Sequence, residues 1–196
     1  GDTFGGSHSL PFPNPTSTDP MNFRPDVSHW PSLSFIAYLL TDDPWHLEGL
    51  QMGAVYCMSA SNYWSDVYKL PGLASLAQIR AFGWSVREIA RASVSGPDVL
   101  PGWLLPKASF GACLDDTLSV LQRTMNGTIT PAPGSPLLAA TRFHLFPPRN
   151  FLPSFEVDYN LHVVGWMRWS GLFSGWDDAV AWLAYPRLSM LNGSSG

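Results

Sequence analysis

Charged residues are scarce in this chain of 196 residues, because Asp, Glu, Lys and Arg together make up only 13% of it, against roughly 25% in an average globular protein. The net charge is −4 and no stretch is rich in Lys or Arg, which argues against a nucleic-acid partner. No apolar run approaches the roughly 18 residues that a membrane-spanning helix needs. We therefore expect no nucleic-acid partner and no transmembrane segment.

The short motifs of cofactor and metal sites are also missing. Cys57 and Cys113 lie in apolar helical pattern and form no Cys-x-x-Cys pair, so buried free thiols are expected. No helix carries His-x-x-x-His or Glu-x-x-His, and there is no Gly-rich phosphate loop and no Gly-x-Ser-x-Gly turn. We predict neither a metal nor a cofactor, and the cellular compartment is left open.

Aromatic residues, proline and glycine are plentiful, with 9 Trp, 11 Phe, 6 Tyr, 18 Pro and 17 Gly. A surface poor in charge and rich in aromatic rings has two explanations. Either much of it is covered by the remainder of a larger polypeptide or by other subunits, or it handles a flat, neutral ligand such as an oligosaccharide. Large interfaces are the commoner explanation.

Apolar residues at steps of three and four predict an all-α fold built of helical hairpins. The first helix is expected to begin near Pro31 or Ser32, and the others to span about 44–61, 75–94, 104–125, 157–173 and 176–190. The first is apolar nearly all round, which predicts a buried inner helix. Only residues 141–146 alternate as a strand would, and only briefly.

Two similar stretches, residues 40–45 and 173–178, separate consecutive helices. In the first, Asp43 is the expected N-cap and Pro44 the first helical residue. Such turn segments between consecutive helices are typical of a stack or ring of helical hairpins. Around it we expect a Pro-rich extended arm at 1–25, a helical hairpin domain at 26–190 containing a long Pro-rich loop at 127–155, and a tail at 191–196.

Asp26 and His29 stand just before the first helix. In a catalytic interpretation, the Asp26 carboxylate orients the His29 imidazole, which acts as a general acid or base. In a structural interpretation, Asp26 or Ser28 caps the helix and His29 bonds a backbone carbonyl, and capping alone accounts for these residue types.

Arg80, Trp84, Arg87 and Arg91 follow one another at steps of four, three and four, so they share one helix face. This pattern predicts a groove for an anionic or sugar-like ligand, in which Trp stacks and Arg donates to oxygens. The alternative is a solvated face on which Glu88 pairs with Arg91.

Asp42, Asp43, His46 and Glu48 surround the first turn of the second helix. Acidic residues there favour the helix dipole, so a structural role is expected. Metal ligation is the alternative.

Three segments, P-D-V-S-H-W-P-S at 25–32, Y-L-L-T-D-D-P-W-H-L-E at 38–48 and Q-I-R-A-F-G-W-S-V-R at 78–87, resemble a large group of poorly characterised bacterial and phage-encoded proteins. Those proteins carry a D-x-x-H-x-P-S segment, a Y-L-L-T-G-D turn and a Q-x-R-x-x-A-W-x-L-R helix. The resemblance covers about residues 8–100 well and the remainder loosely. It implies part of an α/α toroid, the architecture of six-hairpin glycosidases, polysaccharide lyases and sugar epimerases.

Members of that group are longer than this chain, which fits the expected contacts with further polypeptide. Two departures affect what the resemblance implies: Trp30 replaces a usual Gln, and Asp42 replaces a usual Gly at the turn. If that Gln contacts a ligand, its loss weakens the transfer of any activity. Fold alone does not determine function in any case.

The first functional hypothesis is a carbohydrate-active toroid that acts as a polysaccharide hydrolase or lyase. Asp26 and His29 would supply acid/base chemistry, and the substrate-binding residues would be Tyr38, Gln78, Arg80 and Trp84. A hydrolase would pair Asp26 with Glu48, whereas a lyase would use His29 or a Tyr as the base while Arg80 neutralises a uronate.

The second hypothesis is a non-catalytic structural or binding subunit of a larger phage or bacterial surface assembly. A catalyst needs titratable groups that converge on a concave site. A scaffold would instead bury His29 and pair Arg80 internally.

Overall fold

The computed structural model describes residues 27, 30–59, 79–126 and 154–191. These residues form the helices α1 (Leu33–Thr41), α2 (Pro44–Ser59), α4 (Ile79–Val94), α5 (Lys107–Met125), α6 (Ser154–Trp169) and α7 (Asp177–Leu191). Within the described ranges no strand is present. The predicted all-α class is confirmed. Asp26, His29, Gln78 and the arm at 1–25 lie outside the described residues, as do residues 127–153 of the predicted loop and residues 192–196 of the predicted tail. The last two residues of the predicted loop, 154 and 155, already belong to α6, so that loop is shorter than predicted.

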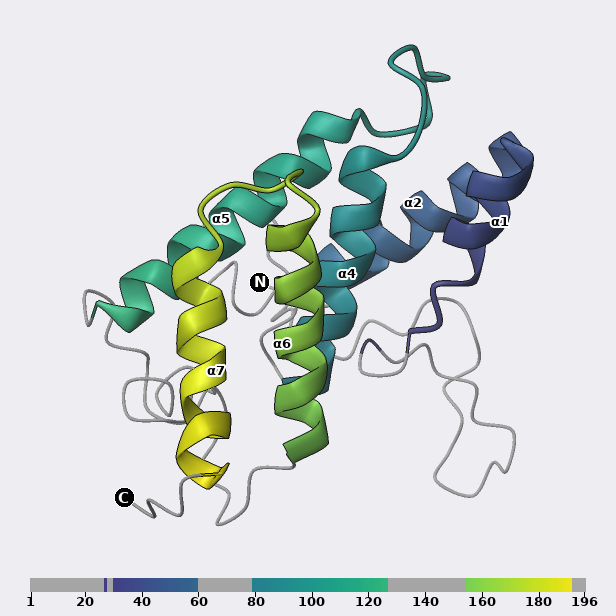
Figure 1. The fold of residues 1–196 in the computed structure, drawn as a ribbon. Coiled ribbons are helices and arrows are strands. Elements are labelled where there is room, and N and C mark those ends of the chain that lie inside the picture. The colour runs from purple at the N-terminus through teal and green to yellow at the C-terminus, as the bar shows by residue number, and fades with distance from the viewer. Residues whose placement is uncertain (1–26, 28–29, 60–78, 127–153, 192–196) are drawn as a thin grey trace, which may run out of the picture.

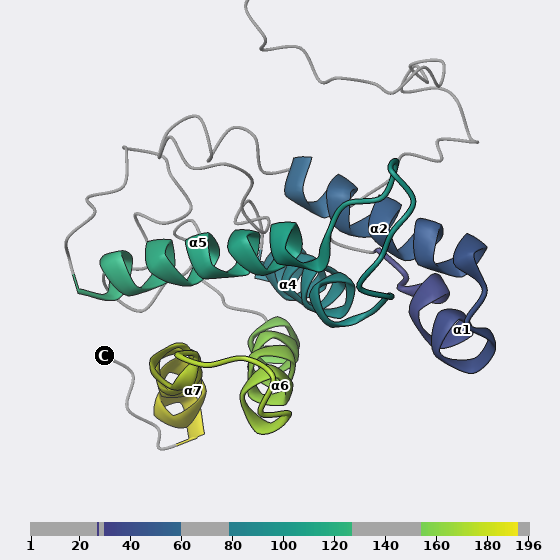
Figure 2. The same ribbon diagram turned by 90° about the horizontal axis from the view of Figure 1, so that it is seen from above.

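Helix α4 lies at the centre and packs against α2, α5 and α6. Figures 1 and 2 show α1 beside α2 at one side of the molecule and the pair α6 and α7 on the other side of α4. Helix α5 crosses α4 and also contacts α7. The core forms where α2, α4, α5 and α6 meet, and its largest fully buried side chains include Leu50, Phe82, Ile89, Phe110, Leu114, Met167 and Trp176.

The two predicted hairpin junctions both connect helices that pack on each other, α1 with α2 and α6 with α7. At the first junction Asp42 is left-handed, with φ 53°, and its N–H donates to the Tyr38 carbonyl at 2.8 Å. The Asp43 carboxylate then accepts from the Trp45 N–H at 2.9 Å, so the predicted N-cap is confirmed. At the second junction Gly171 and Gly175 have φ 70° and 81°, a conformation that ends α6 earlier than the sequence pattern suggested.

The prediction that the first helix is buried on all sides is wrong. Only Tyr38 of α1 is buried, whereas Leu33 is 77% exposed and Leu40 is 80% exposed. The physical reason is that α2 provides most of the packing against α1 among the described helices, so a single side of it is covered. An apolar pattern indicates that a helix can be buried, but further helices must pack against its other sides to bury it.

Other features agree with the pattern. Cys57 and Cys113 are free and buried, as expected. No helix in the described ranges is long and apolar enough to cross a membrane.

Candidate functional site

Helix α4 separates two kinds of side chain onto two faces. The apolar stripe that includes Phe82, Val86 and Ile89 is fully buried in the core. The other face carries Arg80, Trp84, Arg87 and Arg91, and we refer to these residues as the arginine face. Because helical neighbours at steps of three and four lie on one side, the local sequence alone places these side chains together.

Arg87 is the residue that connects this face to the rest of the molecule. Its Nη1 donates to the Tyr159 hydroxyl at 3.0 Å and its Nη2 donates to the Trp30 carbonyl at 2.9 Å. Its Cζ lies 4.2 Å from the centroid of the Trp84 ring, within the range of a cation–π contact. The Arg87 guanidinium is therefore held in one orientation by the segment before α1, by α4 and by α6.

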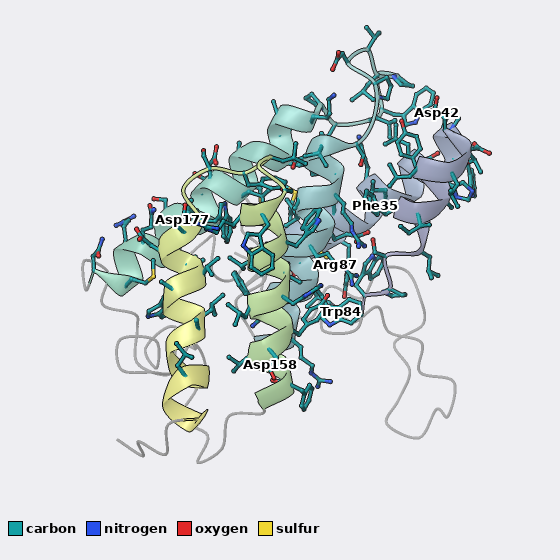
Figure 3. The ribbon with its side chains drawn as sticks, in the orientation of Figure 1. Phe35, Asp42, Trp84, Arg87, Asp158 and Asp177 are labelled. Carbon is teal, nitrogen blue, oxygen red and sulfur yellow. The ribbon has the colours of Figure 1, made fainter. Side chains whose placement is uncertain are left out.

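Two pairs of aromatic rings lie near that guanidinium. Trp84 packs against Tyr159 of α6 with ring centroids 5.3 Å apart, and Trp30 packs against Tyr56 of α2 at 4.8 Å. Figure 3 shows Trp84 and Arg87 of α4 on the same side of the molecule as Phe35 of α1. The result is a partly exposed wall of rings with guanidinium groups set into it.

Arg91 lies one turn beyond Arg87 and is held differently. Its Cζ lies 4.4 Å from the centroid of the Phe35 ring. Its buried Nε has no hydrogen-bond partner among the described residues. Burial lowers the pKa of Arg91, and the nearby charge of Arg87 lowers it further, against the opposing effect of Glu88.

Glu88 is the carboxyl group between these two arginines, and it is only 1% exposed. Its Oε2 lies 4.0 Å from Nη2 of Arg87. Burial raises the pKa of Glu88, while the Ser32 hydroxyl and the charges of Arg87 and Arg91 partly offset the shift. The part of the alternative that places Glu88 on a solvated helix face is therefore wrong, since the carboxyl group lies inside the protein.

Tyr159 is the second titratable group that contacts Arg87. Burial raises the pKa of Tyr159, and the charges of Arg87 and Arg91 oppose that shift. Its oxygen accepts from Arg87, which leaves its own O–H able to donate. The phenol can therefore supply a proton next to a fixed guanidinium.

Gly53 of α2 makes room for this arrangement. A Cβ at Gly53 would lie 2.6 Å from Nε1 of Trp30 and 2.9 Å from Oε1 of Glu88. Gly83 of α4 has the same function toward α6, because a Cβ there would lie 2.8 Å from a ring carbon of Tyr159. Both glycines let a neighbouring side chain approach a helix backbone closely.

The structure places the predicted substrate-binding residues in different environments. Trp84 is partly exposed beside Arg87, as described above. Arg80 pairs with Glu156 of α6 at 2.9 Å. Tyr38 is 8% exposed, and burial followed by the contact with Asp42 raises its pKa. Asp26, His29 and Gln78, outside the described ranges, remain predictions.

Sequence reasoning missed Tyr159, Phe35 and Gly53 as parts of this site. Each comes from a helix other than α4, so no local spacing relates them to the arginine face. Tyr159 follows Glu156 by three residues, and both face α4 through Arg80 and Arg87. The signal that would have suggested α6 is a pair of hydrogen-bond acceptors, Glu156 and Tyr159, at the same helical spacing as the arginines of α4.

A hollow of about 280 Å³ lies away from the arginine face, between the C-terminal end of α4, the start of α5 and the α6–α7 connection, and its lining includes Ser93, Lys107, Asp115, Phe173 and Trp176. Lys107 is paired there with Asp98 at 2.8 Å. None of the predicted site residues lines it. Within the described part of the chain, no group of three or more His, Cys, Asp or Glu residues could hold a metal ion.

No family model, no curated protein and no solved structure matches this chain. The resemblance to toroid proteins and the toroid itself therefore remain predictions.

Proposed function

We propose that this chain is part of a carbohydrate-active α/α-toroid protein, a polysaccharide lyase or hydrolase, and that the arginine face binds the sugar. The observation that carries the proposal is the setting of Arg87. Its guanidinium is fixed by Tyr159 and the Trp30 carbonyl and lies over the Trp84 ring. Fixed donors beside partly exposed rings suit a ligand rich in oxygen atoms with apolar ring faces.

The roles of the residues follow from their surroundings. Arg87 takes the orienting role that the sequence suggested for Arg80, because Arg80 is already paired with Glu156. Trp84 supports Arg87 and presents the rest of its ring to the ligand. Tyr38 and Gln78 stay in the proposal as further binding residues.

The chemistry is simplest to write for a lyase. His29, assisted by Asp26, removes the proton from the carbon next to the sugar carboxylate. The glycosidic C–O bond on the adjacent carbon breaks, a C=C bond forms, and the Tyr159 hydroxyl returns a proton to the leaving oxygen. A buried phenol with a raised pKa keeps its proton near neutral pH, as a general acid must.

For a hydrolase, two carboxyl groups must flank the glycosidic bond. Glu88 is too deeply buried to reach a sugar, at 1% exposed. Asp26 with Glu48 therefore remains the pair proposed for this version of the reaction.

The test is an activity screen on a panel of neutral and acidic polysaccharides, read by new reducing ends and by the ultraviolet absorbance of an unsaturated sugar. Both mechanisms produce reducing ends, whereas only a lyase produces the absorbance. We expect activity in the wild type and a loss of at least about a hundredfold in His29→Ala and Tyr159→Phe. No cleavage and no binding of any member of the panel would contradict the proposal.

The second candidate function is a non-catalytic structural or binding subunit, and two observations favour it. Leu33, Ile36 and Leu40 of α1 are more than half exposed, and Arg80 is paired with Glu156 within the chain. An exposed apolar helix face is typical of an interaction surface. The native particle mass discriminates: a large assembly without sugar binding supports this candidate, whereas a 21.5 kDa species that binds sugars supports the first.

A further inference from the structure

The hollow between the C-terminal end of α4, the start of α5 and the α6–α7 connection is separate from the arginine face, since no residue of that face lines it. Its volume is about 280 Å³, just below the range of roughly 300–1,000 Å³ that is usual for ligand pockets. At about 30 Å³ for each water molecule, this is room for about nine waters. A ligand that fits here is therefore a small molecule or the end of a side chain.

Apolar side chains form much of the lining. Leu114 and Trp176 are buried at the base of the hollow, at 2% and 1% exposed. Phe173 is half-buried and packs against Trp166 with ring centroids 6.1 Å apart, while Leu172 is exposed. An apolar group placed against these side chains releases water from them. The hollow therefore suits a ligand with an apolar body.

Gly111 of α5 leaves the hollow open. Nothing lies within 4 Å of a Cβ built there, whereas the same atom at Gly53 or Gly83 would meet a neighbouring side chain. Close packing therefore explains the other two glycines and does not explain Gly111. A glycine inside a helix weakens that helix, and at this position the missing side chain preserves the space in the hollow.

The charges around the hollow leave one carboxylate without a cation. Lys107 and Asp115 of α5 both line it, and eight residues of helix separate them, about 12 Å along the axis. Lys107 is already paired with Asp98 at 2.8 Å. Arg168, at the end of α6, is paired with Asp177. Asp115 is exposed and forms no ion pair with a described residue.

The other polar groups of the lining also favour a ligand that donates hydrogen bonds. The Ser93 hydroxyl of α4 donates to the Ala90 carbonyl at 2.7 Å, so its oxygen remains able to accept. The Asp115 carboxylate can only accept when it is ionised. The partly exposed ring of Phe173 attracts a cation at its face. Each of these groups favours a cation over an anion.

We propose that this hollow binds a small organic ammonium ion, with its charged group at Asp115 and its apolar body against Phe173 and Leu172. A solvated side chain would account for the exposure of Asp115, but not for the open space at Gly111. A free amine and the side chain of a lysine on another polypeptide share this chemistry. The inference goes beyond the proposed sugar site and does not depend on it.

The experiment titrates the ¹⁵N-labelled full chain with three probes of nearly equal shape and follows the amide signals by nuclear magnetic resonance. The probes are the 2-phenylethylammonium ion, the neutral 2-phenylethanol and the anionic phenylacetate. A lysine blocked at both ends, as its N-acetyl methylamide, is the fourth probe and represents a peptide. Thermal unfolding of each variant confirms that it folds.

Two variants test two different parts of the proposal. Asp115→Asn removes the charge, and Asp178→Asn is its control, because Asp178 is exposed and does not line the hollow. Gly111→Leu fills the space, and Gly102→Leu is its control, because a Cβ at Gly102 also meets nothing within 4 Å and that residue lies outside the lining.

We expect the ammonium probe to bind the wild type with a Kd on the order of 1 mM and to shift the amide signals of Gly111 and Ser174. The alcohol should bind about three- to fivefold more weakly, as should the ammonium probe to Asp115→Asn. Gly111→Leu should lose at least about tenfold in affinity, and both controls should match the wild type. Comparable binding of the blocked lysine would identify a peptide as the ligand, and binding of the free amine alone would identify a small molecule.

Three results would overturn the inference. The first is equal or tighter binding of the alcohol or of phenylacetate. The second is unchanged binding of the ammonium probe in Asp115→Asn or in folded Gly111→Leu. The third is the absence of any shift at Gly111 and Ser174. None of these results bears on sugar binding at the arginine face, which the polysaccharide panel tests separately.

Discussion

The burial of Glu88 and its pKa are set by residues of other elements. It is 1% exposed, and Gly53 leaves the space that its carboxyl group and the Trp30 indole occupy. Burial raises the pKa of Glu88 above 4.5, the value for an ordinary glutamate. The same carboxyl group also raises the pKa of Cys57, after the larger effect of burial.

The raised pKa of Glu88 makes stability depend on pH with a definite sign. Between pH 4.5 and the higher pKa of the folded state, the folded protein binds more protons than the unfolded protein, so the contribution of Glu88 to stability falls as pH rises. We expect the wild type to lose stability relative to Glu88→Gln across this window. Urea unfolding of both proteins at several pH values measures the difference between their free energies of unfolding. The contributions of other titrating groups cancel in that difference. A constant or increasing difference would contradict the assignment.

The backbone of Asp42 is in a strained conformation, which a comparison of two substitutions can reveal. Its φ is 53°, a conformation that Gly adopts freely and other residues adopt at a cost. We expect Asp42→Gly to be more stable than Asp42→Ala by about 1 kcal/mol. Both variants lack the carboxylate that contacts Tyr38, so the comparison isolates the backbone. Urea midpoints that coincide for the two variants would refute the explanation.

Local features of this kind were accessible from sequence. The N-cap at Asp43 follows from backbone geometry within one turn. The partnership of Arg87 with Tyr159 was not accessible, because 72 residues separate them in the chain. Only the packing of α6 on α4 brings them together.

At the scale of helices, substitution by Ala is predicted to have opposite effects on stability at two glycines. Gly53 lies where α2 approaches Trp30 and Glu88, whereas nothing lies within 4 Å of a Cβ built at Gly111 of α5. Gly53→Ala should cost about 1–3 kcal/mol through overpacking, and Gly111→Ala should gain up to about 1 kcal/mol through helix propensity. Thermal unfolding of the two variants against the wild type tests this. A gain in both would show that Trp30 moves aside freely.

Gln51 fastens α2 to the segment before α5. Its Nε2 donates to the Leu105 carbonyl at 3.0 Å, and its Oε1 accepts from the Leu105 N–H at 2.9 Å. Replacing it with Leu removes both bonds, and we expect a loss of about 1–2 kcal/mol. Gln122→Leu on α5, at a position that is only partly buried, is the matched control and should change the free energy of unfolding little. Equal effects would show that the clamp contributes nothing specific.

At the scale of the molecule, α4 decides where the core and the site lie. Its apolar face meets α2, α5 and α6, and its arginine face borders α6 and α1. Any displacement of α4 would therefore disturb the packing of several helices together, and variants of its buried residues should lower the free energy of unfolding.

The thiols report on the integrity of the whole core. Cys57 is 0% exposed and Cys113 is 2% exposed, and burial is the largest effect that raises the pKa of Cys57 to about 12. Because the thiolate is the reactive form, we expect a thiol reagent to modify neither cysteine faster than the protein unfolds. Labelling rates measured at increasing urea should converge on the unfolding rate. Rapid labelling in native buffer would contradict the buried position of either residue.

The sequence by itself determined the helical class, the hairpin junctions, the thiol state and the grouping of four residues on one face of α4, because all of these depend on neighbours within a few turns. Tertiary structure alone decided that Glu88 is buried, that Arg80 is paired with Glu156, that Arg87 is fixed by Tyr159, and that α1 is left largely exposed. The physical reason is the same in each case. The burial of a side chain and its hydrogen-bond partner depend on which distant helix packs against its face. Helical periodicity predicts which residues share a face, but it does not predict which helix packs there.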